Sequence, residues 1–233
     1  MRGCLLTLVA LIVAAVLVIV LVLPAVVSGL AANALQSAGF SGTGTQIDVS
    51  ADPPFRLLTL SADHIRVRST NVSIGALHAD SLDVTLSDAA VLARSFGAIG
   101  GTLVGVQVSP PQGTAIRIAS VSVSGSPTAA NITLRLDQAS MQSLTTTAVK
   151  QQLGAAPTSV TLAAQNLLTF TVRGGRITTK LAVGADGSLI ARDPNSGTTF
   201  TLLTPGVGEP IRFTSVGVNG GVLVLTGTAA LLH

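Results

Sequence analysis

The sequence is poor in the side chains on which most binding sites depend. It contains no Trp and no Tyr, and its aromatic residues are six Phe. Charged residues make up 10% of the 233 positions, and the net charge of +3 comes from 13 Lys and Arg against 10 Asp and Glu. Because nucleic-acid binding usually depends on clustered cations and stacking aromatic side chains, we expect no nucleic-acid partner. The missing Trp and Tyr also argue against a sugar-binding platform.

Residue patterns for catalysis and metal binding are missing as well. Cys4 is the only cysteine, so no intramolecular disulfide can form. The histidines His64, His78 and His233 show no spacing typical of metal ligands. His64 and His78 could form a site together with nearby carboxylates. The simpler interpretation, which we favour, is that both are ordinary histidines on the exposed faces of strands. The sequence has no nucleophile elbow and no phosphate-binding loop. We therefore predict no catalytic residue, no metal, no cofactor and no enzymatic activity.

One long hydrophobic run opens the chain. Cys4–Leu23 is almost uninterrupted, and as a helix it would be about 30 Å long, the thickness of the hydrocarbon core of a bilayer. Arg2 precedes the run, and the next charge after it is Asp48. The positive-inside rule therefore keeps the N-terminus in the cytoplasm and sends the rest of the chain across the membrane.

We divide the chain accordingly into two parts. Residues 1–32 are predicted to be a single-pass membrane anchor, and residues 33–233 are predicted to form an extracytoplasmic domain. The alternative is a long cleavable signal sequence, because residues 32–34 read Ala-Asn-Ala and could be a cleavage site. Cleavage there would make the domain a secreted protein.

Beyond residue 46 the apolar residues recur mostly at every second position, which is typical of strands with one buried face. The segment Arg176–Asp193 shows this pattern on both sides of Asp186-Gly187 and predicts a β-hairpin. A further pair of strands is predicted on either side of residues 219–221, which read Asn-Gly-Gly. Ten or more such strands exceed what a flat open sheet usually holds, so the sheet should curl strongly or close.

Two helical segments are predicted among the strands. Asp137 is a good N-cap for QASMQSLTTTAVKQQL, and Gly154 ends that helix. Ser87 or Asp88 could cap a shorter helix, AAVLARSF, which ends at Gly97. The predicted fold class is α+β: a strongly curved antiparallel β-sheet wrapped around one or two helices and preceded by an N-terminal transmembrane helix.

Apolar surface and a few arginines remain as candidate functional features. A curled sheet lined by aliphatic residues can enclose more volume than its own side chains fill. An acyl chain gains about 0.8 kcal/mol for each CH₂ removed from water, although alternation also describes an ordinary packed core. Guanidinium groups suit phosphate diesters, so Arg66, Arg68, Arg173 and Arg176 are candidates for a lipid headgroup. A solvated outer face is the alternative explanation for these arginines.

The order of these features from about Asn33 onward resembles the LmeA family of phospholipid-binding proteins from actinobacterial cell envelopes. The resemblance covers nearly the whole of the predicted extracytoplasmic part. It rests on the N-terminal anchor and short helix, on the helix after ITLRLDQ, and on the following segments: PPFRLLTLSADHIRVRSTNVSIG, ADSLDVTLSD, VTLAAQNLLTFTV, ADGSLIARDP and IRFTSVGVNGGVLVLTGTAAL.

This resemblance implies a curved sheet around a helix, similar to tubular lipid-binding folds, and a protein that binds phospholipid and supports assembly of envelope glycolipids. It carries over no catalytic residue. For lipid contact we single out the apolar stripe of the helix and one strand residue, which are Met141, Leu144, Val149 and Phe170. An entrance loop that touches the membrane would contain Phe55, Leu57 and Leu58. The alternative function is a structural or protein-interaction domain of the cell envelope without a lipid ligand.

Overall fold

The computed structural model describes thirteen β-strands and one α-helix. The described residues are 40–53, 56, 59, 61–74, 77–90, 93, 95–108, 116–204 and 211–230. In chain order the elements are β1 Phe40–Ser50, β2 Ser61–Ile74, β3 Leu77–Ala90, β4 Ala98–Val108, β5 Ile116–Ser126, β6 Ala129–Leu136, α3 Gln138–Leu153, β7 Ser159–Ala163, β8 Leu167–Val172, β9 Gly175–Val183, β10 Leu189–Arg192, β11 Thr199–Leu203, β12 Ile211–Asn219 and β13 Val222–Ala229. The described part is therefore β-rich α+β, as the alternation predicted.

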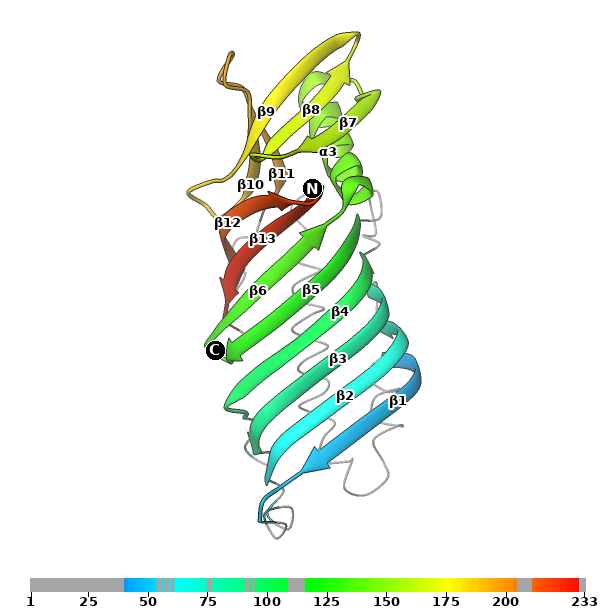
Figure 1. The fold of residues 1–233 in the computed structure, drawn as a ribbon, viewed down its shortest axis with the longest axis vertical. Helices are drawn as coiled ribbons and strands as arrows, with labels where there is room; N and C mark the ends of the chain where they lie inside the picture. Colours follow the sequence, from blue (N-terminus) through cyan, green and yellow to red (C-terminus); the bar gives the residue numbers. More distant parts are fainter. Residues whose placement is uncertain are drawn as a thin grey trace.

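The strands form two antiparallel sheets. The larger one has eight strands in the order β1-β2-β3-β4-β5-β6-β13-β12, and the smaller one has five strands in the order β11-β10-β9-β8-β7. Figure 1 shows the eight strands inclined to the long axis of the molecule, with the smaller sheet at one end. Alternation alone predicts strands without assigning them to sheets, so the division into two sheets is a feature that the sequence did not reveal.

Helix α3 lies where the two sheets meet. It contacts β5 and β6 of the larger sheet and β7 and β11 of the smaller one. Its predicted bounds and caps are confirmed: the Asp137 carboxylate accepts a hydrogen bond from the Ser140 amide at 2.8 Å, and Gly154 ends the helix in a left-handed conformation with φ of 68°. The helix position follows from its buried stripe, because the Thr-rich sequence has little intrinsic helix propensity.

The two predicted hairpins have different turns. Gly220 and Gly221 both have positive φ and join β12 to β13 in a two-residue connection, which is the geometry that matches strand twist in hairpins. The connection between β9 and β10 is longer than Asp186-Gly187, because the strands end at Val183 and resume at Leu189. In that loop the Asp186 carboxylate accepts hydrogen bonds from the Ser188 amide and hydroxyl.

The short helix predicted after Ser87 or Asp88 is wrong. Both residues belong to β3, which continues to Ala90, and Ala90 then forms an antiparallel bridge with Ser95. Pairing decides this segment, because Ala89 of β3 lies opposite Ala62 of β2. A long-range ladder here overrides a local pattern that suits a helix.

Several predicted features lie outside the described residues. These are the membrane anchor over 1–32 and the entrance loop residues Phe55, Leu57 and Leu58. Within the ranges that the structure does describe, no helix combines the length and the apolar character needed to cross a bilayer.

Candidate functional site

The larger sheet has one apolar face, and its side chains line up in rows across the strands. A row runs perpendicular to the strands, each residue lying opposite the next in the antiparallel register. One row that crosses all eight strands consists of Ile47, Val67, Val84, Gly101, Val123, Ile132, Gly227 and Phe213. Ile47 and Gly101 are half-buried and the other members are buried. We call the face that carries this row the apolar face.

The neighbouring row, one residue along each strand, has the opposite character. It consists of Asp48, Arg66, Thr85, Gly100, Ser124, Asn131, Thr228 and Arg212. Every member is exposed or half-buried, and none has an aliphatic side chain. We call the face that carries this row the polar face. The sheet thus separates apolar from polar side chains over its full width.

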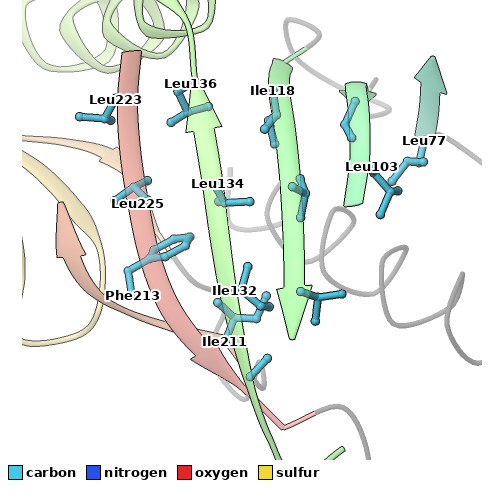
Figure 2. Close-up of a cluster of buried hydrophobic side chains, with 14 of the residues drawn as sticks. Leu77, Leu103, Ile118, Ile132, Leu134, Leu136, Ile211, Phe213, Leu223 and Leu225 are labelled. Atoms are coloured by element: carbon cyan, nitrogen blue, oxygen red, sulfur yellow. The ribbon is translucent and has the colours of Figure 1, made fainter. Parts of the chain in front are cut away.

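The apolar face is wide because it extends over so many strands. Strands in a sheet lie about 4.8 Å apart, so a row across eight strands is about 34 Å long. Figure 2 shows part of this face, with Leu103 of β4, Ile118 of β5, Leu134 of β6 and Leu225 of β13 among other buried hydrophobic side chains. No single strand segment in the sequence indicates this continuity, because it depends on the register of all the strands.

A line of backbone irregularities crosses the sheet without breaking the apolar face. Asn71 in β2 and Gly105 in β4 have positive φ, at 49° and 63°. At this line the alternation of buried residues shifts by one position, so that in β2 residues 65, 67 and 69 are buried before it and residues 72 and 74 after it. Beyond it Val72 and Val106 are again fully buried. Glycine suits position 105, because a φ of 63° lies in the left-handed region where other residues are strained.

The residues predicted to contact lipid lie in the interior beside helix α3. Met141, Leu144 and Val149 form the buried stripe of α3. Phe170 lies in β8 of the smaller sheet, where its ring meets that of Phe200 edge to face, with the ring centroids 5.3 Å apart. All four predicted residues belong to one core cluster. Their contact with lipid stays a prediction, and the structure adds that protein side chains already surround them.

One polar group in this interior stands out. Thr145 lies on the buried side of α3 with no exposed surface, and its hydroxyl has no hydrogen-bond partner among the described residues. A buried hydroxyl without a partner costs about 1–3 kcal/mol. By contrast, the hydroxyl of Thr147, two residues along, donates to the Ser143 carbonyl at 3.1 Å.

Two of the four headgroup candidates are engaged with an acid on the polar face. The Arg66 guanidinium donates two hydrogen bonds to Asp83, at 2.8 and 2.6 Å. These hydrogen bonds hold the pKa of Asp83 below its ordinary value and raise the pKa of Arg66. Arg68 is 4.0 Å from the same carboxylate. A phosphate at this position would therefore compete with Asp83.

The other two headgroup candidates lie at the turn between β8 and β9. Arg173 has a positive φ of 50° and donates a long hydrogen bond of 3.5 Å to the Leu153 carbonyl at the end of α3. The Arg176 side chain is exposed, and within the described ranges its guanidinium makes no hydrogen bond or ion pair. Of the four arginines, Arg176 is the one whose guanidinium needs to give up no described contact to bind an anion.

The histidines on the polar face have hydroxyl partners. His64 is 3.2 Å from the Ser87 hydroxyl, and His78 contacts the Ser73 hydroxyl. Across the part of the chain that the structure describes, no group of three or more His, Cys, Asp or Glu side chains could hold a metal ion. The interactions of His64 and His78 are thus cross-strand pairs that an ordinary sheet would have.

The sequence analysis named the apolar side of a curled sheet as a candidate feature, but it did not identify the residues of the larger sheet that form it. The sequence shows the alternation within each strand, but it does not show the register that aligns Val67 with Val84 and Gly101. The only available signal was the unusual number of strands with one aliphatic side. Comparison with protein-family models, with curated proteins and with solved structures found no match to this chain.

Proposed function

We propose that this chain is a membrane-tethered extracytoplasmic protein that binds the acyl chains of phospholipids on the apolar face and supports assembly of cell-envelope lipids or glycolipids. The supporting observation is the pair of adjacent rows: one is aliphatic, Gly or Phe over all eight strands, and the next is polar, charged or Gly. The resemblance to the LmeA family favours the same class of ligand. The strongly curved sheet around a helix and the N-terminal transmembrane helix are part of this proposal.

The dimensions of the apolar face suit a long hydrocarbon. A row of about 34 Å is longer than a fully extended acyl chain of sixteen to eighteen carbons. Each CH₂ that leaves water contributes about 0.8 kcal/mol, so a chain of this length could gain on the order of 10 kcal/mol before the costs of ordering. Binding would need no specific polar contact, which fits a row that offers only aliphatic side chains, Gly and Phe213.

Helix α3 accounts for only part of the shielding of this face. Its contacts with the larger sheet are centred on β5 and β6, whereas the row begins at Ile47 in β1. Val67 and Val84 are nevertheless buried. An acyl chain would therefore bind by exchanging protein contacts for lipid contacts over this face, and lipid binding should increase the mobility of whatever covers it.

Polar contacts for the headgroup would come from the arginines at the β8–β9 turn. Arg176 is the strongest candidate because no described partner has to be displaced. Arg66 would have to leave a carboxylate that holds it with two hydrogen bonds. Replacing Arg176 with Gln should therefore weaken binding of anionic phospholipid more than replacing Arg66 does.

The proposal is tested by asking whether lipid accompanies the protein. The full chain is purified in detergent, exchanged into a lipid-free detergent, and extracted with organic solvent for mass spectrometry. We expect phospholipid in an amount comparable to the protein. Recovery of no lipid, together with no binding to added phospholipid vesicles, would reject the proposal.

Two neighbouring residues of β3 provide a matched control for that experiment. Val84 lies on the apolar face and Thr85 on the polar face. Val84→Thr places a hydroxyl against the acyl chain and should lower lipid occupancy about tenfold, whereas Thr85→Val should leave it unchanged. Equal lipid occupancy in the two folded variants would show that the lipid does not bind beside Val84.

A further inference from the structure

The two sheets have four edge strands, and an edge strand exposes backbone groups that can pair with another chain. The edges of the larger sheet are β1 and β12, and those of the smaller sheet are β7 and β11. Natural proteins usually block such edges. Three of these four edges are blocked by contacts within the described residues, and the fourth is not.

The edge of β12 is closed by a side-chain amide. The Asn166 side chain donates to the Val216 carbonyl at 3.1 Å and accepts from the Val218 amide at 2.9 Å. Two backbone groups separated by one residue are those that a neighbouring strand would engage. The Asn166 carboxamide thus takes the place of a peptide group and satisfies two backbone groups of this edge.

The smaller sheet uses the same device on β7. The Gln138 side chain donates to the Val160 carbonyl at 2.5 Å and accepts from the Leu162 amide at 3.2 Å. The other edge of this sheet, β11, lies against helix α3. Both edges of the smaller sheet are therefore occupied.

Strand β1 differs from the other three edges. Among the described strands β2 is the one that pairs with β1, and the other side of β1 has no strand partner. The register between the two strands is irregular around Thr43, a feature that discourages pairing by another strand. The register is regular over residues 46–50, where the free side of β1 can accept a strand.

The side chains of this regular half are suited to an added strand. Ile47 and Val49 continue the apolar face but are only half-buried, whereas Val67 and Ile65 beside them in β2 are buried. A further strand with aliphatic residues on the same face would complete their burial. Asp48 projects to the polar face and is exposed. It lies opposite Arg66, whose pKa it helps to raise, but the Arg66 guanidinium donates its hydrogen bonds to Asp83 on the far side.

We propose that residues 46–50 of β1 form a docking edge for an extended segment of a partner protein, which extends the larger sheet by one strand. The segment alternates aliphatic residues, placed beside Ile47 and Val49, with an Arg or Lys placed beside Asp48. A second copy of this chain fits less well, because antiparallel self-pairing centred on residues 46–50 sets the two Asp48 carboxylates opposite each other. This inference goes beyond lipid binding and does not depend on it.

The test uses the full chain in lipid nanodiscs and the synthetic peptide Ac-STVRVTS-amide as the probe. Hydrogen exchange is measured with and without the peptide. We expect the peptide to slow exchange over residues 46–50 and to leave the β12 amides unchanged, because Asn166 already closes that edge. No slowing over residues 46–50 at millimolar peptide would overturn the proposal.

Charge reversal and backbone methylation test the geometry of the complex. Replacing the peptide Arg with Glu should weaken binding about fivefold, and Asp48→Lys in the protein should reverse that preference. Asp48→Asn, which keeps the side-chain shape, should abolish the preference. Two peptides that are N-methylated at alternate positions should differ in affinity for the protein. Methylation removes an amide donor, and only the amides that face β1 donate to it.

Three results would contradict the docking edge. They are an unchanged charge preference in both Asp48 variants, equal binding of the two methylated peptides, and a homodimer. The homodimer is detected by disulfide formation between one copy that carries Gln46→Cys and another that carries Ser50→Cys, both in a Cys4→Ser background, because antiparallel pairing centred on Asp48 sets these two positions opposite each other. The first two results would show that the peptide does not pair with residues 46–50 as proposed, and the third would show that a second copy of the chain uses the edge.

Discussion

The packing around Phe170 allows a sharp prediction about the interior between helix α3 and the smaller sheet. Phe170 has no exposed surface, and its ring meets Phe200 at an interplanar angle of 87° with centroids 5.3 Å apart. In the sheet it lies opposite Val160 on one side and Ile177 on the other. Phe170→Ala removes the ring from all of these contacts and leaves a cavity that the neighbouring strands can fill only in part.

The expected loss follows from these contacts. Truncating a buried Phe to Ala costs about 3–5 kcal/mol, including the aromatic pair. For a domain of this size each kcal/mol corresponds to roughly 2–4 °C in the melting temperature, so a loss of about 4 kcal/mol should lower it by roughly 8–16 °C. Urea denaturation of the full chain in detergent, followed by circular dichroism, gives the free energy of unfolding.

A matched control separates packing from strand propensity. Val104 in β4 is 44% exposed, so Val104→Ala should cost no more than about 1 kcal/mol. If Phe170→Ala costs as little as Val104→Ala, the ring does not lie in a packed interior and our reasoning about this region fails. Lipid recovery from folded Phe170→Ala also tests the predicted lipid contact: a reduced amount supports it, and an unchanged amount shows that Phe170 only fills the core.

Three further predictions concern single polar groups. Thr145→Val should raise the free energy of unfolding by about 1 kcal/mol because it removes an unpartnered buried hydroxyl, while Thr147→Val should not; destabilisation by Thr145→Val would mean that the hydroxyl has a partner. Asp137→Ala should cost about 1 kcal/mol at pH 7. The hydrogen bonds from Ser140 lower the pKa of Asp137, so its contribution is present above the ordinary carboxyl value and is lost as pH falls through the lowered pKa; a cost that stays constant down to pH 2 would contradict this. Asn166→Asp loses the donor to β12 and should cost about 1–2 kcal/mol in urea denaturation, and an unchanged stability would show that this edge needs no cap.

Local signals in the sequence were sufficient for helix α3 and for the β12–β13 turn. Asp137 and Gly154 are strong helix boundaries, and paired glycines at 220–221 supply the positive φ that a two-residue hairpin requires. The predicted helix after Ser87 failed because its apolar spacing is compatible with two structures. Pairing of β3 with β2 and β4 selected the strand.

The candidate site was less accessible to sequence reasoning, because it depends on register between distant strands. The sequence placed Arg66 on a polar strand face, and the structure agrees, but its ion pair with Asp83 follows only from the alignment of β2 with β3. The continuity of the apolar row has the same origin. The caps formed by Gln138 and Asn166 could not be foreseen either, since each connects segments that the sequence does not relate.

The most direct test of lipid binding on the apolar face is photocrosslinking with a phospholipid that carries a diazirine in its acyl chain. The full chain is labelled in nanodiscs, and the modified residues are located by mass spectrometry. We predict labels on residues such as Val67 and Val84, which share the apolar row, and none on Arg66 or Thr85 beside them in the same strands. Labels on the polar face, or no label in residues 61–136, would contradict the account.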